Sequence, residues 1–329
     1  MLNKVSTFSE LIENRLQNID IPGYPESLYK PVHYTLKLGG KRIRPNLVLL
    51  SCGMTGGDPE EALPAAIAIE LLHNFTLIHD DIMDQADTRR GKESVYKKWD
   101  ESTAILSGDV MFAYASRQLK YYGYSNKYSK EQFIRLYDLF NDAVITVCEG
   151  QALDLDFEKD TRISIEDYIK MISAKTAALL RCSFKMGAIV SNSGEEVVDM
   201  AGQIGSEAGI AFQIQDDLLD VIGDPEKFGK KTGGDIYEGK KTFLSILALN
   251  KANTEQRKFL TLTLQDKEKD TADVKKIIQL YEDLGVIEET KQTIERHYQL
   301  SLQYLHNFGQ SNYRNDIEQL LQLLTNRDR

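Results

Sequence analysis

The sequence predicts an all-α protein that forms a single domain over residues 1–329. Apolar residues recur with the 3.6-residue period of amphipathic helices along most of the chain, and only seven prolines interrupt them. No run of alternating apolar and polar residues indicates a half-buried strand. No segment rich in proline, glycine or serine divides the chain as an interdomain linker would.

The charge and cysteine content exclude several classes of protein. With 40 basic and 50 acidic residues, the formal net charge of −10 argues against nucleic acid as a partner. The 3 cysteines are widely spaced and form no metal-binding motif, which indicates reduced thiols and a cytoplasmic protein. The sequence shows neither a signal-peptide core nor a run of 18 apolar residues, so we expect no transmembrane segment.

The N-terminal part contains a helix and then a basic cluster. Residues 3–20 are expected to form an amphipathic helix that ends before Pro22. Gly39 and Gly40 then make a turn ahead of an apolar helix. A basic cluster joins this turn to the helix and consists of Lys41, Arg42 and Arg44. Backbone N–H groups at a helix start, together with such cations, favour an anion, although a basic run is also typical of a solvated surface.

The next helix is strongly apolar and ends in carboxylates. We expect it to begin with Asp58 as the N-cap and to end before Gly91. Near its end lie Asp80, Asp81 and Asp84. Because an α-helix turns by about 100° per residue, these carboxylates cluster and repel one another unless a cation lies between them. Mg²⁺ is the natural candidate, since it binds carboxylates, water and phosphate; the alternative is a solvated acidic helix end.

The same spacing recurs far along the chain, again at the end of an apolar helical run. This second motif, just before Gly223, consists of Asp216, Asp217 and Asp220. The two motifs must belong to different helices. If they face each other across a cavity, they would hold a small cluster of divalent ions and grip a diphosphate from both sides.

Basic side chains flank the two motifs. His73 lies on about the same helix face as Asp80. Arg89 and Arg90 suit a diphosphate, although they also balance nearby acids. The segment after the second motif is rich in glycine and lysine, which suggests a lid over a bound metal–diphosphate. The lysines of this segment are Lys230, Lys231, Lys240 and Lys241.

The remaining segments are expected to be mainly helical. Residues 92–119 contain a core helix, and residues 121–130 form a loop. Lys175 and Thr176 interrupt an apolar helix, where the lysine either extends to the surface or serves an anion in a cavity. Polar amphipathic helices from about residue 250 onward carry no chemistry that we can identify.

Together, these motifs resemble those of the trans-isoprenyl diphosphate synthases, and they follow that family's order from about residue 39 to residue 245. The resemblance implies a helical bundle around a central apolar cavity, usually in a homodimer. It also implies a prenyltransferase that uses Mg²⁺, with three ions when substrate is bound. Such an enzyme joins isopentenyl diphosphate head-to-tail to dimethylallyl, geranyl or farnesyl diphosphate through an allylic carbocation.

The resemblance also assigns roles to residues. The expected Mg²⁺ ligands are Asp80, Asp81, Asp84, Asp216, Asp217 and Asp220. The expected contacts of the allylic diphosphate are Arg89, Lys175, Lys230 and Lys240, and those of isopentenyl diphosphate are Lys41, Arg44, His73 and Arg90. The expected catalytic residues are Lys175, Thr176, Gln213, Asp80, Asp81 and Asp216, with Thr176 and Gln213 bordering the reacting carbons. The family often has a second basic residue where Gly234 stands.

Two positions before the first motif, Phe75 and Thr76, match the family's floor for product length. By helical rise they lie roughly 7.5 and 6 Å before Asp80, where a prenyl tail would descend. Bulky Phe75 favours a short product, and Thr76 leaves more room than a second aromatic ring. We therefore expect geranylgeranyl diphosphate (C20), followed by farnesyl diphosphate (C15); the alternative is that Phe75 is simply a core residue.

Three other functions stay open. A longer-chain polyprenyl diphosphate synthase would share the same motifs. A class I terpene cyclase also ionises a prenyl diphosphate, but Lys41, Arg44 and the second aspartate motif argue against it. A non-catalytic subunit of a heteromeric synthase would commonly lack metal-binding aspartates, whereas this chain has all six.

Overall fold

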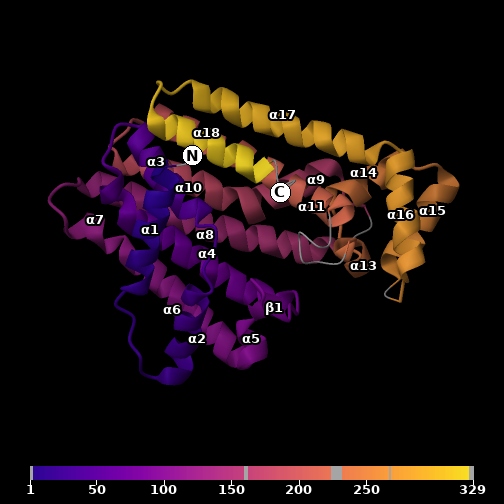
Figure 1. Cartoon of the computed structure of the whole chain (residues 1–329), viewed down its shortest axis with the longest axis horizontal. Coiled ribbons are helices and arrows are strands. Elements are labelled where there is room, and N and C mark those ends of the chain that lie inside the picture. The colour runs from indigo at the N-terminus through magenta and orange to yellow at the C-terminus, as the bar shows by residue number, and fades with distance from the viewer. Residues whose placement is uncertain (1–2, 159–161, 224–231, 267, 326–329) are drawn as a thin grey trace. The chain divides into compact units, whose positions relative to one another are not determined.

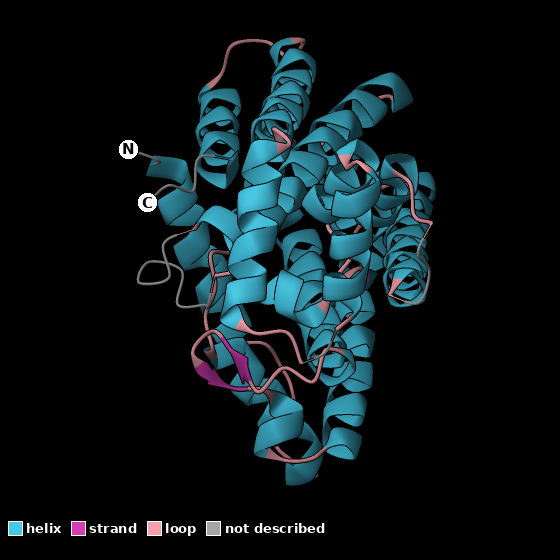
Figure 2. Cartoon of the chain, turned by 90° about the vertical axis from the view of Figure 1, so that its right-hand side faces the viewer, coloured by secondary structure: helices cyan, strands magenta, loops and turns pink. Residues whose placement is uncertain are grey.

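The computed structural model describes residues 3–158, 162–223, 232–266 and 268–325, which are almost entirely helical (Figure 1). Within these residues, the only strands are β1 (Thr88–Arg89) and β2 (Lys92–Glu93), which pair as a short antiparallel hairpin (Figure 2). The predicted all-α fold is therefore confirmed. The chain forms two compact units. Unit 1 comprises Met1–Val144, Leu179–Gly202 and Asn307–Leu320, and unit 2 comprises Ile145–Ala178, Gln203–His306 and Leu321–Arg329.

Unit 1 is built around one long apolar helix, α4 (Leu63–Met83), which packs against α3 and α6. Alanine and branched aliphatic side chains such as Ile67 and Leu71 are fully buried along it. The other elements of this unit are α1 (Asn3–Gln17), α2 (Glu26–Lys37), α3 (Ile43–Met54), the 3₁₀ turn η1 (Pro59–Ala62), α5 (Val95–Lys98), α6 (Glu101–Gln118) and α7 (Lys120–Tyr124). Because α7 occupies part of the predicted loop at residues 121–130, that prediction is wrong for its first residues.

Unit 2 has its own core, in which Tyr168, Ile214, Leu244, Ile277 and Tyr281 pack together. Its elements are α9 (Ile165–Ile172), the π turn η2 (Ser173–Ala177), α13 (Gly234–Glu238), α14 (Phe243–Lys251), α15 (Thr254–Gln265), α16 (Thr271–Asp283) and α17 (Val286–His306). At the right of Figure 1, α14, α15 and α16 lie together, and α17 packs on α14 and α16. Four helices include residues of both units: α8 (Lys130–Phe157), α10 (Ala178–Val190), α11 (Glu195–Ile222) and α18 (Asn312–Thr325).

The two ends of the first aspartate helix differ in how well the sequence predicts them. The predicted N-cap, Asp58, caps η1, the 3₁₀ turn that leads into α4, and its carboxylate accepts the Glu60 N–H at 3.1 Å; the N-cap of α4 itself is Ala62. The predicted end before Gly91 is wrong, because the helix stops at Met83. Gln85 then adopts a left-handed backbone with φ of 51°, and the chain turns into the β1–β2 hairpin.

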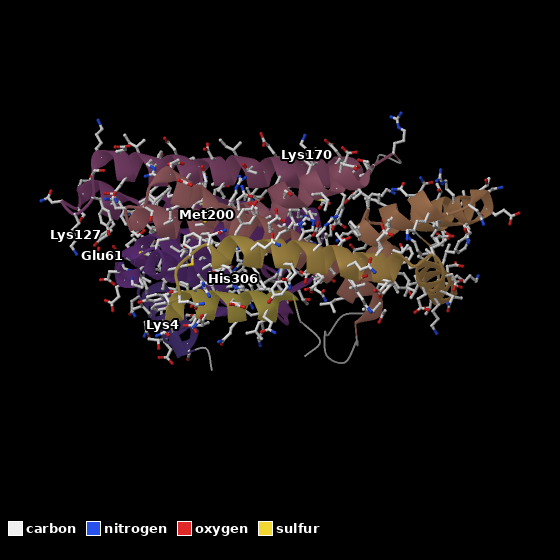
Figure 3. All side chains as sticks on the ribbon, turned by 90° about the horizontal axis from the view of Figure 1, so that it is seen from above. Lys4, Glu61, Lys127, Lys170, Met200 and His306 are labelled. Carbon is white, nitrogen blue, oxygen red and sulfur yellow. The ribbon has the colours of Figure 1, made fainter. Side chains whose placement is uncertain are left out.

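Side chains fasten the start of this helix to the loop after α7. Glu61 forms an ion pair with Lys127, and both are labelled together in Figure 3. The same carboxylate accepts hydrogen bonds from the hydroxyls of Tyr121 at 2.7 Å and Tyr128 at 2.9 Å. These contacts fix the end of the first aspartate helix that lies opposite to its motif.

One described helical segment, Pro59–Met83, has the length and composition to cross a membrane, with a mean hydropathy of 1.3 over 18 residues. However, 61% of that window is buried within the protein, as expected for a core helix. The expected absence of a transmembrane segment stays a prediction.

Candidate active site

The first aspartate motif lies in the last turn of α4, in unit 1. Asp81 is buried, and its Oδ1 accepts hydrogen bonds from Arg89 Nε at 2.9 Å and from Nη2 at 2.5 Å. Asp80 Oδ2 lies 3.9 Å from the same guanidinium, and Asp84 is the C-cap of the helix. Burial raises the pKa of Asp81, and Arg89 opposes that rise. The hairpin after α4 therefore places a cation beside the carboxylates of this motif.

Basic side chains converge beside the Gly39–Gly40 turn of the same unit. Arg44 Nη1 lies 3.3 Å from His73 Nε2. Arg90 donates a hydrogen bond to the Gly39 carbonyl, and its guanidinium lies against Gly40, where an added Cβ would be 3.0 Å away. Burial and the surrounding arginines lower the pKa of His73 well below 6.5, so its imidazole is neutral. The result is a cationic cluster with one neutral hydrogen-bonding ring.

Arg42 belongs to the same sequence cluster but has a structural role. Its side chain is 1% exposed and pairs with Glu13 at 2.6 Å and with Glu70 at 2.5 Å. These carboxylates raise the pKa of Arg42 despite its burial. The pairs connect α1, α3 and α4, whereas the adjacent Lys41 is exposed.

The two predicted chain-length residues lie within α4. The Phe75 ring is 5.6 Å from the ring of Phe112 in α6, which is 6.3 Å from that of Phe140 in α8. Thr76 Oγ1 donates to the carbonyl of His73 at 2.8 Å. Three helices of unit 1 thus contribute one ring each to an aromatic stack that begins one turn before the motif.

The second motif lies near the end of α11, in unit 2, and its central aspartate is held by uncharged donors. The Tyr168 hydroxyl donates to Asp217 Oδ2 at 2.5 Å, and the Phe243 N–H donates to the same oxygen at 3.0 Å. Gln213 Nε2 donates to Oδ1 at 3.2 Å. Burial, followed by the charge of Asp235, raises the pKa of Asp217 to about 7.

The last aspartate of the second motif anchors the following helix. Asp220 Oδ2 accepts the Asp235 N–H at 3.0 Å, at the start of α13. Lys240, just after α13, lies 2.8 Å from Glu238 and 3.8 Å from Asp235. Of the predicted lid lysines, Lys230 and Lys231 lie outside the described residues.

Lys175 and Thr176 lie on the π turn that separates α9 from α10. Lys175 Nζ donates to Asp154 Oδ2 at 2.6 Å. Thr176 Oγ1 donates to Gln213 Oε1 at 2.8 Å, so the Gln213 amide connects Thr176 to Asp217. Single π turns of this kind occur frequently at functional sites because they redirect side chains.

Two glycines explain how neighbouring helices approach this wide turn. A Cβ on Gly150 of α8 would lie 2.2 Å from the backbone nitrogen of Lys175. A Cβ on Gly209 of α11 would lie 2.5 Å from the Ala177 Cα. Any side chain at either position would therefore displace the backbone that carries Lys175.

A cavity of about 110 Å³ in unit 2 brings predicted residues together. The predicted site residues that line it are Lys175, Thr176, Gln213, Asp217 and Lys240. Lys241, predicted as a lid lysine, also lines it, and the sequence interpretation missed the polar lining residues Asp154, Tyr168, Asp235 and Thr242. Helical spacing offered a signal for Tyr168, which lies two turns before Lys175; no comparable signal marked Asp154.

The carboxylates fit a metal that is shared with a ligand. Within the described parts of the chain, no group of three or more histidine, cysteine, aspartate or glutamate side chains could hold a metal unaided. Asp81 and Asp217 already accept hydrogen bonds from their neighbours. Mg²⁺ takes few protein carboxylates and completes its shell with water and phosphate, so the donor set suits a magnesium–diphosphate complex. The six-ligand assignment stays a prediction.

The chain matches one protein family and is similar to many known proteins, of which three serve as examples. The family described as Polyprenyl synthetase matches residues 25–281. A geranylgeranyl diphosphate synthase of Saccharolobus solfataricus is 39% identical, over 82% of this chain and 81% of that protein. A geranylfarnesyl diphosphate synthase of Aeropyrum pernix is 40% identical, over 70% and 73%. The crystal structure of geranylgeranyl pyrophosphate synthetase from Pyrococcus horikoshii Ot3 has a TM-score of 0.91 at 36% identity, covering 99% of this chain and 98% of that one.

Proposed function

The chain belongs to the polyprenyl synthetase family, and on this premise we propose that it makes geranylgeranyl diphosphate from isopentenyl diphosphate and shorter allylic diphosphates. Membership of this family makes the chain a prenyltransferase. The main support in the structure is the unit 2 cavity, where Lys175, Gln213 and Asp217 meet from different helices.

Magnesium would bind to the motif carboxylates together with the allylic diphosphate. We assign direct coordination to the six motif aspartates: Asp80, Asp81, Asp84, Asp216, Asp217 and Asp220. Asp81 and Asp217 also accept hydrogen bonds that fix each motif in place. Bound Mg²⁺, three ions in the loaded enzyme, supplies Lewis-acid stabilisation of the leaving diphosphate.

Two sets of basic residues would bind the two diphosphates. For the allylic substrate these are Arg89, Lys175, Lys230 and Lys240. For isopentenyl diphosphate they are Lys41, Arg44, His73 and Arg90. Lys175 donates a hydrogen bond to Asp154, and an incoming diphosphate oxygen would compete for that ammonium. Neutral His73 contributes a hydrogen bond beside Arg44 without adding charge.

In the proposed reaction, the bond between C1 and oxygen of the allylic substrate breaks, and negative charge on the leaving diphosphate is stabilised by the lysines. The double bond of isopentenyl diphosphate attacks the allylic cation, and a proton then passes to the released diphosphate. The oxygens of Thr176 and Gln213 border the cation, and their mutual hydrogen bond fixes them. Water must be excluded, because it would trap the cation as an alcohol.

The aromatic stack is proposed to set product length. Phe75 is its first ring, and Phe112 and Phe140 support it from α6 and α8. Identity to relatives does not decide the product, since a geranylgeranyl and a geranylfarnesyl synthase match at 39% and 40%. Phe75→Ala should therefore lengthen the product, whereas an unchanged product would leave Phe75 as a core residue.

Product analysis tests the proposal. The purified chain would be incubated with Mg²⁺, isopentenyl diphosphate and, separately, C5, C10 or C15 allylic diphosphates, and the products identified by mass spectrometry. A dominant C20 product supports the proposal, and a C15 or longer product would correct its length. Release of hydrocarbon or alcohol without elongation would favour a terpene cyclase. Activity only with a second polypeptide would favour a subunit of a heteromeric synthase.

We also propose a cytoplasmic homodimer. Unit 1 exposes large apolar side chains on α6 and α8, namely Ile105, Leu106, Ile134 and Tyr137. A second copy of the chain would cover such surface, and light scattering after gel filtration would measure the resulting mass. We further propose that both units form one catalytic domain, which predicts a single cooperative unfolding transition.

A further inference from the structure

Unit 2 contains a second cavity that the proposed reaction does not use. Its volume is about 530 Å³, compared with about 110 Å³ for the cavity that contains Lys175. The segment before α9, the end of α14 and the helix α15 form its walls. A cavity of this size is in the range of small-molecule binding sites.

The charged side chains of this cavity favour an anion. Arg162, Lys241 and Arg257 line it, and Glu166 is the one acidic residue among the described lining residues. Arg257 Nε donates to the Leu249 carbonyl at 3.1 Å, which ties the guanidinium to α14. Such a fixed planar group presents its remaining N–H donors in the geometry that phosphate oxygens accept. The cavity is therefore cationic in a protein whose net charge is −10.

Lys241 is the most enclosed of these cations. Its side chain is half-buried, and burial lowers its pKa. No acidic side chain in the described parts of the chain pairs with its ammonium. A bound anion would replace the solvation that this ammonium loses on burial.

Apolar side chains complete the cavity. Ile163, Ile165, Leu249 and Leu264 line it beside the cations. This combination suits an amphiphile with an anionic head and an apolar portion better than it suits an inorganic ion alone.

Lys241 also lines the cavity that contains Lys175, so the residue that carries this ammonium is common to both cavities. A ligand in the larger cavity would attract this ammonium and alter the electrostatics of the smaller one. The two cavities are therefore positioned to influence each other.

We propose that the larger cavity, lined by Arg162, Lys241 and Arg257 and called here the outer diphosphate pocket, binds a diphosphate group and lowers turnover when it is filled. The proposal rests on the proposed function, because that reaction supplies two such ligands. One is released inorganic diphosphate, and the other is the prenyl diphosphate product. Both share the diphosphate, and only the second would use the apolar wall.

Binding to the full chain tests the pocket. In equilibrium dialysis with labelled inorganic diphosphate and Mg²⁺, the unmodified chain should bind at two sites. Arg257→Gln should weaken one of them about tenfold, as expected for the loss of a charge-assisted hydrogen bond. Lys258→Gln is the matched control, since it removes a neighbouring exposed charge of α15 that does not line the pocket. A second dialysis series with geranylgeranyl diphosphate distinguishes the two sources of the diphosphate group. If Arg257→Gln weakens the binding of geranylgeranyl diphosphate alone, the pocket is assigned to the product.

Arg162→Gln gives an independent variant in the segment before α9, in case Arg257→Gln perturbs α15. Inorganic diphosphate should also inhibit the unmodified chain non-competitively with respect to the allylic substrate. The Arg257→Gln variant should lack this non-competitive inhibition. Equal binding of both probes by Arg257→Gln, Arg162→Gln and Lys258→Gln would overturn the proposal. Dialysis needs no condensation, so failure of the proposed function would appear only in the product assay.

Discussion

The two aspartate motifs have the same spacing but differ in what holds their central carboxylate. In unit 1, Asp81 is bound by the charged Arg89. In unit 2, Asp217 is bound by the Tyr168 hydroxyl, an amide and a backbone N–H, and its pKa is raised to about 7. The first arrangement depends on an ion pair and the second on uncharged hydrogen bonds. Equal motifs in a sequence therefore do not imply equal electrostatics in the fold.

The largest expected effect is common to both motifs. Asp80→Ala and Asp216→Ala should each lower kcat by roughly a thousandfold, which corresponds to about 4 kcal/mol of lost transition-state stabilisation. Steady-state assays measure the loss, and circular dichroism should show unchanged helix content. If either variant condenses substrate at near the normal rate, the two motifs do not share the metal-binding role.

The next effect separates the motifs. Arg89→Gln should lower the free energy of unfolding by about 2 kcal/mol, because it leaves the Asp81 carboxylate buried without its cation. This loss is smaller than that expected for a fully buried ion pair, because Arg89 is partly exposed. Urea denaturation measures this change. The control is Lys97→Gln, whose exposed pair with Asp87 should contribute nothing measurable. Equal stabilities of the two variants would mean that Arg89 does not support the motif.

A smaller effect is expected in unit 2. Tyr168→Phe should cost about 1.5 kcal/mol of stability, because the buried Asp217 loses a donor. Since that bond lowers the pKa of Asp217, its loss should raise the pKa further and increase the Mg²⁺ concentration for half-maximal rate about fivefold. Tyr281→Phe is the matched control, as its buried hydroxyl has no hydrogen-bond partner among the described residues. Unchanged Mg²⁺ dependence in Tyr168→Phe would exclude a supporting role for this hydroxyl.

The smallest effect concerns pH and unit 1. The pKa of His73 is lowered in the folded state, so below pH 6.5 the unfolded chain binds a proton that the native chain does not. Stability from this group is therefore lost as the pH falls, by about 1 kcal/mol between pH 6.5 and 5.5. Urea denaturation at both pH values should show this loss, and His73→Gln should reduce it. The same pH dependence in both proteins would show that His73 is not its source.

Local patterns in the sequence were sufficient for the fold and for part of the site. Apolar periodicity predicted the helices, and Lys175, Thr176 and Gln213 line one cavity as their motifs suggested. The end of α4 at Met83 could not be predicted, because a left-handed Gln85 redirects the chain well before Gly91.

Residues whose roles depend on distant partners were harder to predict. Arg42 stands between Lys41 and Arg44, yet pairs with carboxylates from two other helices and is buried. Asp154 could not be assigned a role from the sequence, because its contact with Lys175 requires the packing of α8 on the π turn. The sequence shows which side chains are charged, but tertiary packing decides which partner each of them contacts.

The π turn at residues 173–177 amounts to one extra residue within an otherwise regular helix. Loss of a single codon there would allow a continuous α-helix, in which the flanking turns keep their register and the side chains of the present π turn are redirected. Lys175 and Thr176 would then no longer point in their present directions, even with every other codon intact. A lineage can therefore exchange many residues in this segment and keep the site, whereas a change in its length would erase the site in one mutational step.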